Sequence, residues 1–130
     1  MIQDSAVAED KIASLKREGG WELTEMKQDG IDVALVPKGR TLLVFRDKGV
    51  TGTGGVNSFF GSCEIGEDGE IKFGGFGSTL KGGPRNLMNQ EAKIIAVLGK
   101  ATSYSIEGDR LTLSDESGDN CLVYVPKKKK

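Results

Sequence analysis

The sequence contains no histidine among its 130 residues, so the side chain that most often serves as a general base near neutral pH is missing. It has no apolar run long enough to cross a bilayer. Cysteines number two, Cys63 and Cys121, and neither has a histidine to activate its thiol. These absences argue against a histidine-dependent or cysteine-dependent enzyme and against a transmembrane protein.

Aromatic residues and prolines are also scarce, at 6% of the chain and three residues, whereas glycines number 19. A chain of this length predicts one domain with a core that folds without disulfides or metals. Frequent glycines between short segments favour a turn-rich β protein over a helical bundle.

Net charge is −1, but four of the 18 basic residues are the terminal Lys127–Lys130. Residues 1–126 carry 14 basic against 19 acidic residues, or −5, which argues against a nucleic-acid surface. The start of the chain lacks signal-peptide features, and Ile2 stands where N-myristoylation requires glycine. We therefore expect a cytoplasmic protein, monomeric, with both cysteines reduced.

Hydrophobic periodicity predicts two helices and about seven or eight short antiparallel strands. A short N-terminal helix spans Ser5–Glu18, and the main helix spans Asn86–Leu98 with Ile95 and Leu98 buried and Gly99 after its end. Trp21, Leu23 and Glu25 are placed on one strand face, and Asp29-Gly30 predicts a hairpin. The strands are expected at 21–27, 31–35, 40–46, 59–65, 70–73, 103–106, 111–113 and 121–125, with irregular or bulged chain at 74–79.

The glycine-rich stretch Gly52–Gly61 surrounds Phe59 and Phe60, a mixture that suits a strand turning sharply and re-entering a core. The fold class that follows is α+β: a curved antiparallel sheet with the main helix packed on its concave side. We divide the chain into an N-terminal helical extension (1–19), one domain (20–126) and a basic tail (127–130).

Motifs scattered between Gly20 and Val125 resemble the META domain family, which includes HslJ-like bacterial lipoproteins and a virulence-associated kinetoplastid protein. The matching segments are Trp21 with Leu23, Thr41–Phe45, Gly52–Gly61, Ser78-Thr79, Leu87–Leu98 and Tyr104–Leu113. The motif positions within them are Trp21, Gly52, Asn57, Phe59, Gly61, Thr79, Glu91, Gly108 and Asp109.

The resemblance implies a cracked-barrel fold, a possible link to secretion, virulence or stress, and no established chemistry. Family members often carry one cysteine just before the motif asparagine and another after the Ser-Thr step. Val56 and Gly83 stand there in this chain, as suits a protein kept in a reducing compartment.

Other candidate motifs have simpler interpretations. Gly52-Thr53-Gly54 lacks the Gly-Lys-Ser/Thr ending of a phosphate loop, so turn or bulge geometry is favoured. Asp115, Ser117, Asp119 and Asn120 resemble half of a calcium loop, but the later bidentate glutamate is missing and a hairpin turn is favoured. We expect no cofactor and no metal.

Two hypotheses for a functional site stay open. Phe59, Phe60, Phe76 and Met88 line an apolar cavity or simply fill the core. Glu91, which lies on the apolar face of the main helix, is a tuned acid or a structural hydrogen-bond acceptor. The expected function is a non-enzymatic binding or adaptor domain for a protein partner or an apolar ligand such as a lipid. The alternatives are an enzyme using the Glu91 carboxylate and a structural stress or assembly factor.

Overall fold

The two ends of the domain meet in one sheet, because the last strand pairs with the first. The computed structural model describes residues 12–37 and 39–127. Its elements are β1 (Trp21–Gln28), β2 (Ile31–Val33), β3 (Leu42–Phe45), β4 (Gly49–Thr53), β5 (Ser58–Ile65), η1 (Glu67–Gly69), β6 (Ile71–Ser78), α2 (Arg85–Lys100), β7 (Ser103–Glu107), β8 (Arg110–Ser114) and β9 (Cys121–Pro126). Strands follow the order β6-β5-β4-β3-β1-β9-β8-β7, with β2 paired to β1 outside this path.

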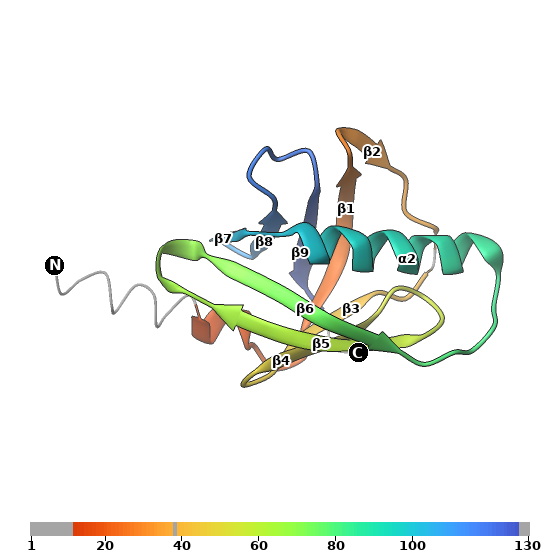
Figure 1. Cartoon of the computed structure of the whole chain (residues 1–130), viewed down its shortest axis with the longest axis horizontal. Helices are drawn as coiled ribbons and strands as arrows, with labels where there is room; N and C mark the ends of the chain where they lie inside the picture. Colours follow the sequence, from red (N-terminus) through yellow and green to blue (C-terminus); the bar gives the residue numbers. More distant parts are fainter. Residues whose placement is uncertain (1–11, 38, 128–130) are drawn as a thin grey trace, which may run out of the picture.

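The sheet curls into a half-barrel, and α2 lies across its open side (Figure 1). Its two edge strands, β6 and β7, come close at one end, where Ile71 N–H donates to Thr102 O at 3.1 Å and Glu70 bridges Ser103. All the paired strands are antiparallel. The predicted curved antiparallel sheet with one main helix is confirmed. The strand that was not predicted is β4, which lies at the start of the glycine-rich stretch.

Helix α2 begins after Pro84 and extends the predicted helix at both ends. Leu98 is fully buried, as expected, whereas Ile95 is only partly buried at the edge of the core. Gly99 lies inside the helix rather than after its end, because the chain leaves the helix at Ala101 in an extended conformation. A proline at this start is favourable, since the first helical turn leaves backbone N–H groups without partners in any case.

The predicted placement of Glu25 on the same face as Trp21 and Leu23 is wrong, because β1 contains a register shift. Pairing of β1 with β9 shifts between Leu23 and Glu25, so the buried side chains are Trp21, Leu23 and Met26, and Glu25 is exposed. A bulge adds one residue to a strand and thereby reverses the faces that follow it. Glu25 instead forms an exposed ion pair with Arg110 at 2.9 Å.

The hairpin predicted at Asp29-Gly30 is confirmed. Both residues have positive φ, 51° and 81°, the combination that a tight turn between twisted strands requires. The return strand β2 is shorter than predicted and ends at Val33, with Ile31 exposed.

The N-terminal helix is much shorter than predicted within the described chain, where residues 12–15 are helical. The remainder of the predicted helix, residues 5–11, lies outside the described residues. Leu15 is fully buried, and its carbonyl accepts a 2.9 Å hydrogen bond from Trp21 Nε1. This contact fixes the segment before β1 against the core.

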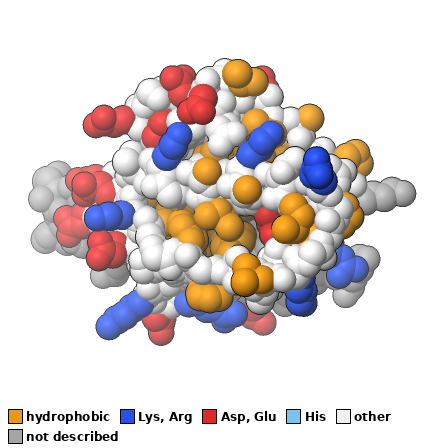
Figure 2. Space-filling view, turned by 45° about the vertical axis from the view of Figure 1, so that its right-hand side comes forward, with side chains coloured by type: hydrophobic (Ala, Val, Ile, Leu, Met, Phe, Trp, Pro, Cys, Tyr) orange, Lys and Arg blue, Asp and Glu red, His pale blue; other side chains and the backbone are white. Residues whose placement is uncertain are grey.

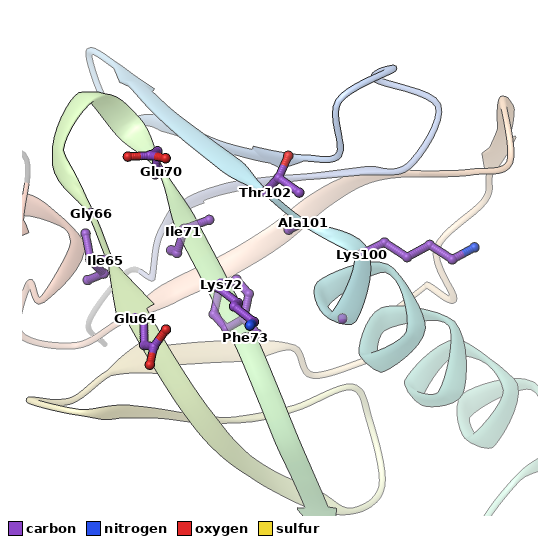
Figure 3. Close-up of a pocket in the computed structure, with 11 residues that line it drawn as sticks. Glu64, Ile65, Gly66, Glu70, Ile71, Lys72, Phe73, Lys100, Ala101 and Thr102 are labelled. Carbon is purple, nitrogen blue, oxygen red and sulfur yellow. The ribbon is translucent and has the colours of Figure 1, made fainter.

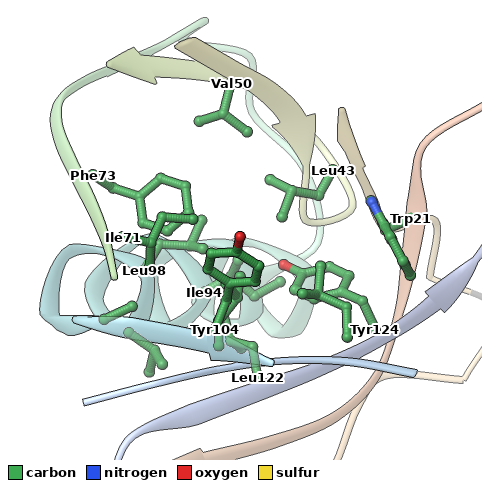
Figure 4. Close-up of a cluster of buried hydrophobic side chains, with 14 of the residues drawn as sticks. Trp21, Leu43, Val50, Ile71, Phe73, Ile94, Leu98, Tyr104, Leu122 and Tyr124 are labelled. Carbon is green, nitrogen blue, oxygen red and sulfur yellow. The ribbon is translucent and has the colours of Figure 1, made fainter. Parts of the chain in front are cut away.

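The core fills the concave side of the sheet and is closed by α2 (Figure 4). Trp21, Leu43, Tyr104 and Tyr124 come from strands on both halves of the sheet, and Ile94 and Leu98 face them from the helix. Burial raises the pKa of the Tyr124 hydroxyl, so this side chain stays neutral in the core.

The two cysteines lie on separate parts of the sheet. Cys63 is buried in β5 and Cys121 is half-buried in β9, with β4, β3 and β1 between those strands. Neighbouring strands are about 4.8 Å apart, so three intervening strands exceed the Cα separation of a disulfide. The register therefore does not bring the two thiols together. Within residues 12–37 and 39–127, no helix has the length and hydrophobicity that crossing a membrane requires.

Candidate functional site

Three motif positions that are far apart in the sequence converge beside α2. Asn57 follows the glycine turn, Thr79 follows β6, and Glu91 lies in the middle of the helix. Their side chains form one hydrogen-bonded network, which we call the polar box. The box ties the turn before β5 and the end of β6 to the helix that closes the half-barrel.

Glu91 is the charged acceptor of the polar box. Its side chain is 5% exposed, and Oε2 accepts hydrogen bonds from the backbone N–H groups of Val56 and, at 2.6 Å, Asn57. Oε1 accepts a 3.1 Å hydrogen bond from Asn57 Nδ2. A carboxylate that accepts several hydrogen bonds loses little by burial, because these donors replace water. The arrangement matches the structural alternative for Glu91, and its two oxygens already have partners.

Asn57 connects the helix to the chain after β6. Its Oδ1 accepts hydrogen bonds from Thr79 Oγ1 at 3.0 Å and from the backbone N–H of Lys81 at 2.6 Å. Thr79 Oγ1 in turn accepts a 3.1 Å hydrogen bond from the N–H of Ser58. An asparagine presents donors and acceptors on the same short side chain, and this site uses both.

Gln90 is a second buried polar residue of α2 that the sequence interpretation missed. It is 4% exposed, its Oε1 accepts from Val36 N at 2.7 Å, and its Nε2 donates to Gly54 O at 2.8 Å. Helical spacing does predict its burial, because Gln90 is four residues before Ile94 and therefore lies on the same buried face of α2. A polar side chain on such a face requires backbone partners, and two loops provide them.

The remaining motif positions shape the backbone and the core. Gly52 lies where a Cβ would be 2.2 Å from Leu42 O, and Gly61 lies under the Phe76 ring. Gly108, with φ of 62°, and Asp109 form the turn between β7 and β8. Trp21 and Phe59 are core side chains. These positions serve the turns and the core of the fold and are not part of the polar box.

The four side chains proposed to line a cavity are not gathered around one space. Phe59 is 1% exposed and Phe60 is 53% exposed, because successive residues of β5 point to opposite faces. Phe76 is partly buried and packs edge-on against Phe59, with ring centroids 6.2 Å apart. Met88 alone of the four lines the groove described next.

An apolar groove of about 450 Å³ lies between α2 and the chain after β6, directly over the polar box. Met88, Ala92 and Ile95 form its helix wall, and Leu80 and Lys81 form part of the opposite wall. Leu80 is 96% exposed, although leucine is among the residues most often buried. Figure 2 shows hydrophobic side chains gathered in a hollow on this side of the molecule. We call this surface the helix groove.

A larger cleft of about 500 Å³ opens where β6 and β7 diverge near the end of α2 (Figure 3). Ile71 and Phe73 line it, and Glu64, Glu70, Lys72 and Lys100 carry both signs of charge around it. Lys100 also pairs with Asp29 at 3.4 Å. None of the nine motif positions lines this cleft, so the helix groove is the stronger candidate site.

The loop that resembles half of a calcium site is a closed turn. Asp115 Oδ1 accepts from the Ser117 hydroxyl and from the N–H groups of Gly118 and Asn120, and Oδ2 accepts from Asn120 Nδ2 at 2.9 Å. These hydrogen bonds, led by that of the Asn120 side chain, lower the pKa of the Asp115 carboxyl. The carboxylate is thus used by its own loop, as the hairpin interpretation predicts.

The thiols are poorly suited to nucleophilic chemistry. Burial raises the pKa of Cys63 to about 11, and burial also raises the pKa of Cys121. Only the thiolate is an effective nucleophile, so both groups are protonated and slow near neutral pH.

Comparison with known proteins identifies the family and the fold of the chain. The META domain family model matches residues 13–128. No curated protein matches the sequence. A solution structure of a protein from Burkholderia xenovorans is similar, with a TM-score of 0.71, 20% identity, and coverage of 91% of this chain and 88% of that one. A crystal structure of a DUF4847 family protein from Bacteroides vulgatus has a TM-score of 0.64 and 13% identity, with coverage of 92% and 99%.

At these identities the two structures establish a shared fold and nothing about activity. The family match covers most of the chain and includes the segments that build the polar box and the half-barrel. The chain is therefore a member of the META domain family.

Proposed function

We propose that this protein is a non-enzymatic binding domain whose helix groove receives an apolar group of a ligand or protein partner. The observation that carries the proposal is the groove itself, an apolar hollow of about 450 Å³ beside a fully exposed leucine. Ligand sites are typically concave, mostly apolar and a few hundred Å³ in volume. Leu80 adds to this apolar surface, and contiguous exposed apolar surface marks interaction sites more often than a single exposed leucine does.

The polar groups beneath the groove support binding rather than catalysis. Glu91 and Asn57 form hydrogen bonds with each other and with backbone N–H groups. Among the described residues, no buried side-chain nitrogen or oxygen lacks a hydrogen-bond partner. A general acid or base must reach a substrate proton, and a carboxylate held in this way would first have to give up structural bonds.

The proposal includes a reducing, cytoplasmic setting, supported by two free cysteines that lie too far apart to pair. A role in secretion, virulence or stress rests on the family resemblance alone.

The test compares two substitutions of exposed hydrophobic residues. Leu80→Asp removes an apolar wall of the groove, and Ile31→Asp makes the same change at a β2 residue that is 69% exposed and not part of it. Fluorescence of the hydrophobic dye ANS should increase with wild type and Ile31→Asp and should fall with Leu80→Asp, with folding checked by circular dichroism.

A hydrolase substrate panel is run alongside with wild type and Glu91→Gln. Equal ANS binding by wild type, Ile31→Asp and Leu80→Asp would contradict the groove as the binding site. Turnover by wild type that Glu91→Gln abolishes would favour the carboxylate enzyme instead.

A further inference from the structure

The charged residues that line the helix groove are Lys81 and Glu91, and the chain segment that builds the groove is mainly basic. Between Thr79 and Lys100 the basic residues are Lys81, Arg85, Lys93 and Lys100, and the one acidic residue is Glu91. Glu91 is buried and engaged in the polar box, so its charge faces backbone N–H groups rather than the solvent. This local excess of positive charge stands out in a chain whose residues 1–126 are acidic overall.

Two of these cations are placed to reach a ligand in the groove. Lys81 lines the groove, and its backbone is held by the 2.6 Å hydrogen bond to Asn57 Oδ1. Arg85 begins α2 and lies three residues before Met88, so both side chains emerge on the same helix face. Both basic residues are exposed. A flexible lysine and a planar guanidinium can together bind one carboxylate at the mouth of an apolar surface.

The three side chains of the polar box at the base of the groove offer little to a polar ligand. Asn57, Thr79 and Glu91 are satisfied within the protein, as described above, and the rest of the helix wall is aliphatic. A ligand seated here therefore gains mainly by burying hydrocarbon against the helix wall.

From this geometry we infer that the helix groove binds an aliphatic chain that ends in a carboxylate, with the chain against Met88, Ala92 and Ile95 and the head group at Lys81 and Arg85. This inference rests on the proposed function and specifies its ligand class as a long-chain carboxylate. Electrostatic attraction sets the head-group preference, and burial of the chain supplies most of the affinity.

The experiment titrates the full chain, below the micelle concentration, with three probes of equal chain length: dodecanoate, dodecanol and dodecyltrimethylammonium. Binding is measured by displacement of ANS and by calorimetry. Dodecanoate should bind about tenfold more tightly than dodecanol, as expected from two exposed charge pairs of about 0.7 kcal/mol each. The cationic probe should bind most weakly.

Variants distinguish the head-group contact from the groove. Lys81→Glu combined with Arg85→Glu should abolish the preference for dodecanoate and leave dodecanol binding within about twofold, as expected for exposed charges remote from the chain. Lys48→Glu combined with Lys72→Glu, two exposed lysines outside the groove, is the matched control and should keep the preference.

The outcomes separate this inference from the proposed function. Equal affinity for dodecanoate and dodecanol, both lost with Leu80→Asp, would contradict the carboxylate inference and support the groove. Tighter binding of the cationic probe would overturn the inference as well. Absence of binding for all three probes would contradict this inference, whereas the ANS comparison of Leu80→Asp with Ile31→Asp decides the proposed function. Addition of 0.5 M NaCl should reduce the dodecanoate preference, because salt screens exposed pairs.

Discussion

Glu91 acts in this protein as a buried hydrogen-bond acceptor that holds a loop to a helix. Its carboxylate accepts from two backbone N–H groups and from Asn57 Nδ2. Glu91→Gln keeps the shape but replaces one acceptor by an NH₂ group that faces backbone donors. We expect a loss of about 1–3 kcal/mol in the free energy of unfolding, measured with urea.

Glu107→Gln is the matched control for this change. Glu107 is an exposed residue of β7, and its substitution should alter stability by less than about 0.5 kcal/mol. A Glu91→Gln protein as stable as this control would show that the polar box contributes nothing to the fold.

The two cysteines give a second prediction at the residue scale. Because burial raises the pKa of Cys63 to about 11, its thiol should react with iodoacetamide at pH 8 far more slowly than an exposed cysteine. Cys121 is less buried and should be labelled first in the native protein. Mass spectrometry should find both labelled in 6 M urea, and failure to label either one there would reveal an oxidised pair.

At the scale of elements, the contact between the glycine turn and α2 requires a residue without a side chain. A Cβ on Gly54 would lie 2.6 Å from Glu91 Cγ and 2.8 Å from Glu91 Cα, closer than real contacts allow. Gly54→Ala should therefore push the helix from the turn and destabilise the protein by about 1–3 kcal/mol. Gly82→Ala, where nothing lies within 4 Å, should be close to neutral in the same thermal melt.

The turn between β8 and β9 should make stability depend on pH. Hydrogen bonds from Asn120, Gly118 and Ser117 lower the pKa of Asp115 below its unfolded value of about 3.9. Its contribution is fully present above that value and is lost as the pH falls through the lower, folded pKa. The melting temperature of wild type should fall more between pH 5 and pH 2.5 than that of Asp115→Asn, and parallel curves for the two proteins would contradict this role.

Elements with strong local signals were predictable from the sequence. The Asp29-Gly30 turn and the apolar stripe of α2 determine their own conformations, and the structure confirms both. The bulge that exposes Glu25 and buries Met26 was not predictable, because it depends on pairing with β9 about one hundred residues later. The partners of Gln90 are likewise set by two loops distant in the sequence.

The candidate site was predictable only in part for the same reason. Glu91 was recognised because a charge on an apolar helix face demands a partner. Leu80, a single leucine in a loop, carries no periodic signal, and its exposure becomes visible only when β6 and α2 are placed together. The residue type of Phe60 predicts a place in the cavity, but the alternation of β5 puts it on the face opposite to Phe59.

At the scale of the whole molecule, α2 closes a half-barrel, and the polar box fixes that helix beside the helix groove. The central claim is that an apolar group binds in the helix groove rather than in the larger cleft between β6 and β7. Both spaces have comparable volumes, about 450 and 500 Å³, so size does not decide between them.

The most direct measurement is a methyl NMR titration with dodecanoate, using protein labelled at alanine, isoleucine, leucine and methionine methyl groups. Intermolecular NOEs from the chain should reach Leu80, Met88, Ala92 and Ile95, and the methyl groups of Ile65 and Ile71 should show none. NOEs confined to Ile65 and Ile71 would place the ligand in the cleft between β6 and β7 and would contradict the account.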